Sequence, residues 1–318
     1  MPTRGGAPVT VVKDVDLDLA RGESLALVGE SGCGKTTTLL SILGLLPRGA
    51  SIAAGEVGFG DLDLRRADER ELRAVRGGQI GVIWQDPLAA LDPVMRAGAQ
   101  IAEVVRAHAG VDRRAGARRA KDLMRLVELP DVERTFDAYP HELSGGQRQR
   151  VVIAAAIAAD PVLLLADEPT TALDVTVQDQ VLALLARLRD ELGLALLLVT
   201  HDLAVVSETC ERVAIMYAGR IVESGPAAEV FAAPRHHYAA GLLAAAPDVD
   251  RPGVRPAGIA GTPPAGVALD RCAFEPRCPR ADDVCARVLP ALSGDSTHRA
   301  ACHHQLGAVP HAVERHRG

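Results

Sequence analysis

A glycine-rich segment followed by a lysine and a threonine is the first part of the sequence whose residue types suggest chemistry. Residues 29–36 read Gly-Glu-Ser-Gly-Cys-Gly-Lys-Thr, between an apolar run of strand length, Leu25 to Val28, and a helical pattern over 36–46. Glycines let the backbone wrap closely around phosphates, and the N–H groups at a helix start favour negative charge. The segment therefore predicts a phosphate-binding loop in which Lys35 reaches the β- and γ-phosphates and Thr36 holds Mg²⁺.

The chemistry of such a loop requires further polar groups at the ends of neighbouring strands. Leu163 to Asp167 is an apolar run ending in a carboxylate suited to Mg²⁺, and Glu168 follows as the expected general base that polarises the attacking water. Gln85 and His201 each follow another short apolar run. Taken singly, each of these residues is weak support for a site. Their common position at strand ends predicts that they gather around the phosphates.

A second candidate anion site begins at Leu143-Ser144-Gly145-Gly146-Gln147. Ser144 and the glycine N–H groups open the helical run over 151–158, so they can present donors to a negative charge. Asp174 precedes another helical run and is expected to cap it.

These motifs, in this order, resemble the ATPase subunit of an ATP-binding-cassette (ABC) transporter, from about residue 8 to the C-terminus. The resemblance implies that His201 contacts the γ-phosphate, that Gln85 touches Mg²⁺ and water, and that the Ser144 region faces the γ-phosphate held by a second cassette. Cys33 stands at a variable position of the loop, and its side chain is interpreted as inert filler. The resemblance also implies that Asp174 lies at the interface between the two cassettes and that Mg²⁺ is held by Thr36, Gln85 and Asp167. The residues implied to contact the nucleotide are Gly29, Ser31, Gly32, Cys33, Gly34, Lys35, Thr36, Thr37, Ser144, Gly145, Gly146, Gln147 and Asp174.

The fold class expected is α/β, a phosphate-loop NTPase core with an inserted helical lobe and a small cysteine-containing extension. Strands are predicted over 9–19, 25–28, 80–84, 162–166 and 195–200, and helices over 36–46, 99–107, 117–129 and 177–192. Continuous apolar runs such as 195–200 suit parallel strands covered on both faces. The predicted domains are a cassette over 1–235, with the helical lobe at about 87–159, and an extension over 236–318 that begins with a Pro/Gly-rich linker and ends in a disordered, His-bearing tail.

Composition places the chain among ordinary globular proteins. The 318 residues are 48% hydrophobic and 24% charged, and the net charge of −6 argues against nonspecific nucleic-acid binding. No apolar run has the length of a membrane span, and residues 1–8 lack the apolar core of a signal peptide. A cytoplasmic protein is expected, bound through partners to the inner face of a bacterial membrane.

Four of the six cysteines cluster near the end of the chain with the spacing C-x5-C-x6-C-x16-C. In a reducing compartment Cys272, Cys278, Cys285 and Cys302 suggest a metal rather than disulfides. The tight pair of a structural zinc site is absent, and four thiolates also hold iron–sulfur clusters, so spacing alone leaves both open. His298, His303 and His304 are kept as reserve ligands and are expected to be solvated.

The stretch from Cys272 to Pro279, with Cys285 and Ala301-Cys302-His303, resembles the extension of oligopeptide and dipeptide importer ATPases. That resemblance favours a [4Fe–4S] cluster over Zn²⁺ and implies import of peptides or a related solute such as nickel. The implied partners are a second cassette (a copy or a related chain), two permeases and an extracytoplasmic solute-binding protein. Family members also begin with an extra strand carrying an aromatic residue that stacks on adenine. Here no Tyr or Phe precedes Phe59, so we expect phosphate and Mg²⁺ contacts to carry more of the affinity.

The alternative is a non-transport ABC ATPase of DNA repair or chromosome architecture. Such proteins insert long coiled coils or zinc modules before the second motif. The stretch from Gln85 to Ser144 is short and lacks sustained heptads, which disfavours that alternative.

Overall fold

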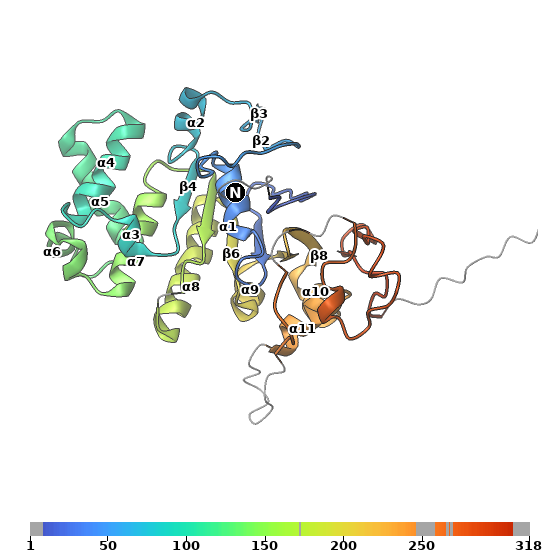
Figure 1. The fold of residues 1–318 in the computed structure, drawn as a ribbon. Helices are drawn as coiled ribbons and strands as arrows, with labels where there is room; N and C mark the ends of the chain where they lie inside the picture. Colours follow the sequence, from blue (N-terminus) through green and yellow to red (C-terminus); the bar gives the residue numbers. More distant parts are fainter. Residues whose placement is uncertain (1–8, 172, 246–257, 265–266, 268–269, 308–318) are drawn as a thin grey trace, which may run out of the picture.

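The structure, a computed structural model, describes residues 9–171, 173–245, 258–264, 267 and 270–307. Within these residues the chain forms a mixed sheet flanked by helices, with a helical lobe beside one edge and the C-terminal extension beside the other (Figure 1). The predicted α/β class is thereby confirmed.

The main sheet has eight strands in the order β4-β5-β6-β1-β7-β8-β10-β9. From β4 to β7 all neighbours are parallel, and the pairs from β7 onward are antiparallel. In sheet order the strands are β4 (Ile80–Ile83), β5 (Leu163–Asp167), β6 (Ala195–Thr200), β1 (Ser24–Val28), β7 (Arg212–Tyr217), β8 (Arg220–Pro226), β10 (Arg299–Ala300) and β9 (Ser293–Gly294). A separate hairpin pairs β2 (Gly58–Phe59) with β3 (Leu62–Asp63).

Both faces of the parallel strands are buried, which explains why their sequences are continuously apolar. Alternate residues enter different cores: Ala26 and Val28 of β1 face one cluster, and Leu25 and Leu27 face the other. The first cluster includes residues of α7, α8 and α9, and the second includes Leu39 of α1. This two-sided burial fixes the register of the strands, because a shift by one residue would exchange the two faces.

The helices form three groups (Figure 1). Beside the core lie α1 (Lys35–Ile42), α2 (Glu69–Val75), α8 (Val175–Leu192) and α9 (Leu203–Thr209); the lobe holds α3 (Pro87–Ala90), α4 (Ala97–Ala109), α5 (Arg113–Leu126), α6 (Val132–Asp137), the 3-10 turn η1 (Pro140–Glu142) and α7 (Gly145–Ala156); near β8 lie α10 (Ala227–Ala232), α11 (His237–Ala245) and the 3-10 turn η2 (Glu275–Arg277). None of the helices in the described ranges is both long and apolar enough to cross a membrane.

The strand predicted over 9–19 is wrong: the described part of that segment contains no strand. Its alternating apolar residues do pack, since Val15, Leu17 and Leu19 contact the second core cluster. A strand, however, needs a partner backbone along its length, and the backbone bond from Lys13 N–H to the Gly219 carbonyl is a single contact rather than a ladder. The alternating pattern over 9–19 therefore reflects burial of one side of the segment, without pairing to a neighbouring strand.

The C-terminal extension is joined to the cassette through the sheet itself. Strand β10 pairs with β8, with Ala300 opposite Glu223. Glu223 is fully buried, and its carboxylate accepts hydrogen bonds from the N–H groups of Arg235 and His236 at 2.7 Å each and contacts His298 Nε2 at 2.7 Å. The expectation that His298 is solvated is therefore wrong. The predicted domain boundary at 235/236 remains a prediction, and the predicted tail beyond 307 lies outside the described residues.

His236 makes the stability of this junction depend on pH. Burial lowers the pKa of His236 to about 3, and its Nδ1 accepts the Tyr238 N–H at 3.0 Å, as a neutral ring can. In the unfolded chain a histidine titrates near 6.5, so below that pH the unfolded state binds a proton that the folded state does not. The free energy of unfolding should therefore decrease as the pH is lowered below 6.5, and this group should account for a loss of about 2 kcal/mol by pH 5.

Chemical denaturation at pH 7 and pH 5 checks this expectation. His236→Asn keeps an acceptor for the Tyr238 N–H, so the variant should lose less stability than the unmodified chain on acidification. His108→Asn, at an exposed position, serves as the control and should behave like the unmodified chain. An equal loss in all three proteins would contradict the assignment.

Candidate functional site

Four polar segments meet where the parallel strands end. Strand β1 leads into the glycine loop, β4 to Gln85, β5 to Asp167 and Glu168, and β6 to His201. Because β4, β5, β6 and β1 are adjacent and parallel, their carboxyl ends lie at one edge of the sheet, where ligands bind in open α/β folds. The structure thus brings together the residues predicted from their positions at strand ends.

The glycine loop has the backbone geometry that its sequence predicts. Gly34 precedes α1 with φ 113°, a left-handed conformation that disfavours any side chain. A Cβ at Gly29 would lie 2.2 Å from the Met216 carbonyl oxygen, so only glycine fits there. Ser31, Gly32 and Thr36 are exposed and face solvent, whereas the Cys33 side chain is buried in the second core cluster. Burial raises the pKa of the Cys33 thiol, consistent with a packing role.

Lys35 is buried and folds back over its own loop. Its ammonium donates to the Gly29 carbonyl at 2.6 Å and to the Glu30 carbonyl at 3.2 Å, and lies 3.9 Å from Glu168 Oε1. The positive charge is thus held in the middle of the loop, beside the candidate base. Phosphate oxygens arriving in the loop would take over these hydrogen bonds.

Glu168 contacts side chains from several segments of the site. Its carboxylate accepts from Gln85 Nε2 at 3.1 Å and from the Thr171 hydroxyl at 2.9 Å, and lies 3.3 Å from His201 Nδ1. Its φ of 46° is unusual for a residue with a side chain, and its N–H donates to the Val199 carbonyl at 2.8 Å. Such strain is stored at functional sites when surrounding bonds enforce it. The conformation aims the carboxylate toward Lys35 and His201.

Oxygen ligands suitable for Mg²⁺ lie next to the base. The Thr36 hydroxyl donates to Asp167 Oδ1 at 3.3 Å. Burial raises the pKa of Asp167, and the neighbouring Glu168 charge adds to this, whereas the Thr36 hydrogen bond opposes it. A hydroxyl and a buried carboxylate with no arginine between them fit a hard divalent cation that would compensate the carboxylate charge. Two of the three predicted ligands, Thr36 and Asp167, are therefore compatible with Mg²⁺, while the third, Gln85, bonds Glu168 through its amide nitrogen.

The second predicted anion site is built at the start of α7. Ser144 caps α7 in a reciprocal box with Gln147: the serine hydroxyl accepts the Gln147 N–H at 3.3 Å, and the glutamine oxygen accepts the Ser144 N–H at 2.9 Å. Asp174 caps α8, and Gly146 packs against Val177 of that helix, where a Cβ would lie 2.8 Å from Val177 Cγ1. Among the hydrogen bonds of the described residues, none joins Ser144 to the glycine loop, and Ser144 is exposed.

Comparison with protein families agrees with this geometry. Residues 12–171 match the ABC transporter family, and residues 222–285 match the C-terminal region of oligopeptide/dipeptide transporters. The first match contains the glycine loop, Gln85, Ser144 and Glu168. The chain belongs to the ABC transporter ATPase family.

Individual relatives cover nearly the whole cassette and extension. A "probable peptide ABC transporter ATP-binding protein" of Sinorhizobium fredii is 47% identical over 91% of this chain and 87% of its own length. The dipeptide transport ATP-binding protein DppD of Bacillus subtilis is 42% identical over 98% of this chain and 94% of its own length. The dimeric cassette MJ0796 bound to ADP and Pi superposes with a TM-score of 0.61 and 31% identity, over 68% of this chain and 90% of that one.

The four cysteines of the extension of this ABC ATPase form a loose group, in which no three of the sulfurs lie within 4.8 Å of one another. The Cys272 N–H donates to the Cys285 carbonyl at 3.1 Å, and a charge on Cys285, Cys302 or Cys278 would raise the pKa of Cys272. Burial is the larger effect and raises the pKa of Cys272 to about 11. A cation at these sulfurs would favour the thiolates.

One tighter group within the extension was not predicted. Asp282, Cys285 and His304 place one ligand atom each within 4.8 Å of the others, and His304 Nε2 lies 2.9 Å from Asp282 Oδ2. Asp282 escaped prediction because a lone acidic residue between cysteines is common. His303 contacts the Val288 carbonyl through Nε2 at 3.0 Å.

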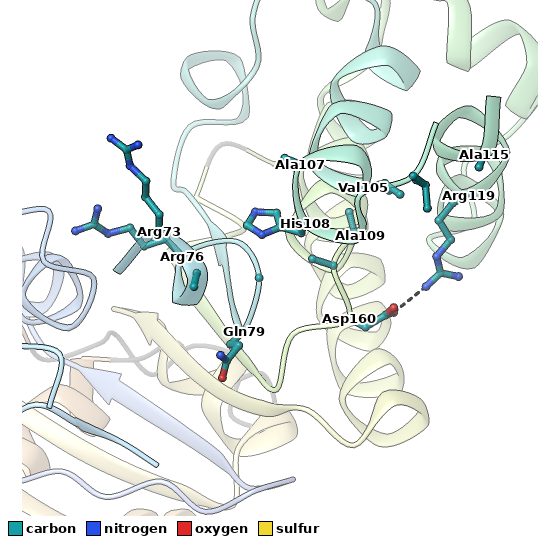
Figure 2. A pocket seen from close by; sticks show the side chains of 15 residues that line it. Arg73, Arg76, Gln79, Val105, Ala107, His108, Ala109, Ala115, Arg119 and Asp160 are labelled. Carbon is teal, nitrogen blue, oxygen red and sulfur yellow. Dashed lines mark hydrogen bonds and ion pairs between the residues drawn. The ribbon is translucent and has the colours of Figure 1, made fainter. Parts of the chain in front are cut away.

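A cavity of about 1050 Å³ lies away from the nucleotide site of the ABC ATPase, between α2, α4 and α5 (Figure 2). Its cationic lining is engaged internally: Arg119 pairs with Asp160 at 2.7 Å, and Arg76 Nε donates to the Leu43 carbonyl at 2.7 Å. The first pair joins α5 of the lobe to the turn before β5, and the second joins the end of α2 to the end of α1. We assign the cavity no ligand.

Three residues that support the nucleotide site have no sequence signal of their own. Thr171 bonds the base Glu168, while Tyr238 and Arg277 bond Glu30 in the glycine loop. The last two are separated from Glu30 by 208 and 247 positions. No motif spacing connects such distant residues.

Proposed function

We propose that this ABC ATPase energises import of peptides or a related small solute across a bacterial membrane. The observation that carries the proposal is the second family match, residues 222–285 to the oligopeptide/dipeptide transporter C-terminal region. The cassette match alone does not separate transport from repair. The relatives named for peptide import support the same choice, and the comparisons give no support to a role in DNA repair.

In the proposed cycle, two cassettes close on two ATP molecules. Lys35 binds the β- and γ-phosphates, and the exposed Ser144 region supplies donors to the γ-phosphate on the partner cassette. Glu168 takes a proton from the attacking water, while His201 and Gln85 orient the γ-phosphate and the water. The exposure of Ser144 and the dimeric cassette MJ0796 support the use of two chains. In this arrangement Asp174 lies at the interface between the two cassettes.

The remaining partners are two permeases and a solute-binding protein, which would hold this chain at the cytoplasmic face of the membrane. Reconstitution of this chain with its permeases and binding protein in proteoliposomes tests the proposal. Labelled di- and oligopeptides should accumulate with ATP and not with ADP. Accumulation of nickel without peptide would change the proposed substrate to a metal ion and leave the importer assignment intact. ATP hydrolysis without any solute movement would contradict the proposed transport function.

We further propose that Cys272, Cys278, Cys285 and Cys302 hold a [4Fe–4S] cluster. The four cysteines support this, because such a cluster takes one thiolate per iron; Cys285 is buried and the other three are half-buried. The alternative is one Zn²⁺ on Asp282, Cys285 and His304, a mixed donor set of the kind zinc accepts.

Metal content separates the two alternatives. Protein purified without oxygen should carry about four irons and four sulfides per chain. That content should be lost on Cys278→Ser or Cys285→Ser and kept on His304→Gln. One zinc and no sulfide, lost with His304→Gln, would support the alternative and leave the ATPase assignment intact.

A further inference from the structure

The cysteine-bearing extension makes direct contact with the phosphate-binding loop. Arg277, in the turn η2 next to Cys278, forms a two-pronged ion pair with Glu30: Nη1 to Oε2 at 2.6 Å and Nη2 to Oε1 at 2.9 Å. The Arg277 side chain is only 4% exposed. Glu30 is the second residue of the glycine loop, and its carbonyl accepts the Lys35 ammonium. The pair therefore reaches the backbone that is expected to wrap the phosphates.

The guanidinium is fixed on every side. Nε donates to the Ala260 carbonyl at 2.8 Å, Nη2 also to the Ile259 carbonyl at 3.3 Å, and Nη1 also to the Tyr217 hydroxyl at 3.3 Å. With the two bonds to Glu30, all five N–H groups of an arginine have acceptors. Such a fork loses little freedom when it binds a carboxylate, so its geometry is transmitted to the loop.

Aromatic rings hold this arginine from the other side. The guanidinium carbon lies 5.8 Å from the Tyr217 ring centre and 5.9 Å from that of Phe274. Tyr238 packs against both rings, with centres at 4.5 and 5.5 Å, and its hydroxyl accepts the Glu30 N–H at 2.9 Å. Glu30 is thus held by its side chain and by its backbone, both times by residues beyond 235.

We propose that Arg277 is a positioning residue for the nucleotide site, through which the extension holds the phosphate loop in its binding shape. The inference rests on the proposed ATPase function. A loop already ordered before the phosphates arrive loses less conformational entropy on binding. Loss of the ion pair should therefore weaken nucleotide binding without removing any group that touches the nucleotide.

A fluorescent ADP analogue (methylanthraniloyl-ADP) with Mg²⁺ tests this in the full chain. Arg277→Gln should raise its Kd about tenfold, since a hydrogen-bonded charge is worth about 1.4 kcal/mol or more. Arg287→Gln removes an exposed arginine that pairs with Asp283 on the same extension, and it should leave the Kd unchanged. Lys35→Ala should weaken binding at least a hundredfold. If the unmodified chain does not bind the analogue, the proposed function fails; if it binds and Arg277→Gln binds equally well, only this inference fails.

A double-variant cycle excludes a merely structural effect. Glu30→Gln and Arg277→Gln should each weaken binding, and the two together should weaken it no further than the stronger single change, because both break one pair. Independent, multiplying losses would overturn the proposal. So would a Kd for Arg277→Gln within twofold of the unmodified chain.

Hydrogen exchange on the unmodified protein gives a readout that needs no variant. Because coupling is reciprocal, the ADP analogue should slow exchange of amides 272–278 as well as those of the glycine loop. Slower exchange confined to residues 29–37 would show that the extension does not sense the loop and would contradict the proposal, even if the variants fail to fold.

Discussion

A chain carrying Glu168→Gln is expected to bind MgATP normally and to hydrolyse it about 10²- to 10⁴-fold more slowly, the usual contribution of a positioned base. The amide keeps the size of the side chain and can still bond the Thr171 hydroxyl, so the site should remain assembled. It cannot take a proton from water. It also loses the negative charge beside Lys35 and His201, which should if anything favour the binding of phosphates.

Steady-state phosphate release and nucleotide affinity, measured on the same preparation, check this expectation. Glu191→Gln, a partly exposed glutamate on α8 that pairs with Arg187, provides the matched control and should retain full turnover. Hydrolysis by Glu168→Gln at the normal rate would show that another group activates the water. Loss of binding together with turnover would instead assign Glu168 to the architecture of the loop.

Lys35→Ala should have the opposite signature, with nucleotide affinity lost first. The buried ammonium is the cation at the centre of the glycine loop, and each charged hydrogen bond it would make to a phosphate is worth about 1.5–3 kcal/mol. Losing two of them corresponds to at least a hundredfold weaker binding. The Gly29 and Glu30 carbonyls would also lose the donor that they share.

Equilibrium titration with a fluorescent ATP analogue measures the loss. Lys121→Ala, which removes a lysine on α5 outside the nucleotide site, should bind as the unmodified chain does. Affinity retained by Lys35→Ala within a few-fold would mean that backbone N–H groups and Mg²⁺ hold the phosphates without the lysine. Comparison with Glu168→Gln then separates binding from chemistry within one site.

The sequence predicted the core of the site because each catalytic group lies directly after a short, continuously apolar strand. A short run that is apolar throughout favours a strand buried on both faces, and parallel neighbours bring the strand ends together, as for Glu168 after β5 and His201 after β6. Prediction failed where side chains are buried in an alternating pattern but the backbone does not pair with a strand, as in 9–19. It also failed where partners are far apart in sequence: Arg277 and Tyr238 reach Glu30 through contacts that no local pattern records.

The pairing of β10 with β8 has a consequence for how the extension can be studied. A chain cut after residue 245 would leave β8 as a bare sheet edge, open to association with other chains. It would also strip Glu223 of His298, leaving a carboxylate walled off from water with fewer partners. Truncation would thus generate a sticky, poorly folded cassette and mimic a loss of activity. Single substitutions at the cysteines or at Arg277 leave the pairing of β10 with β8 in place. They are therefore better suited than truncation for testing what the extension contributes.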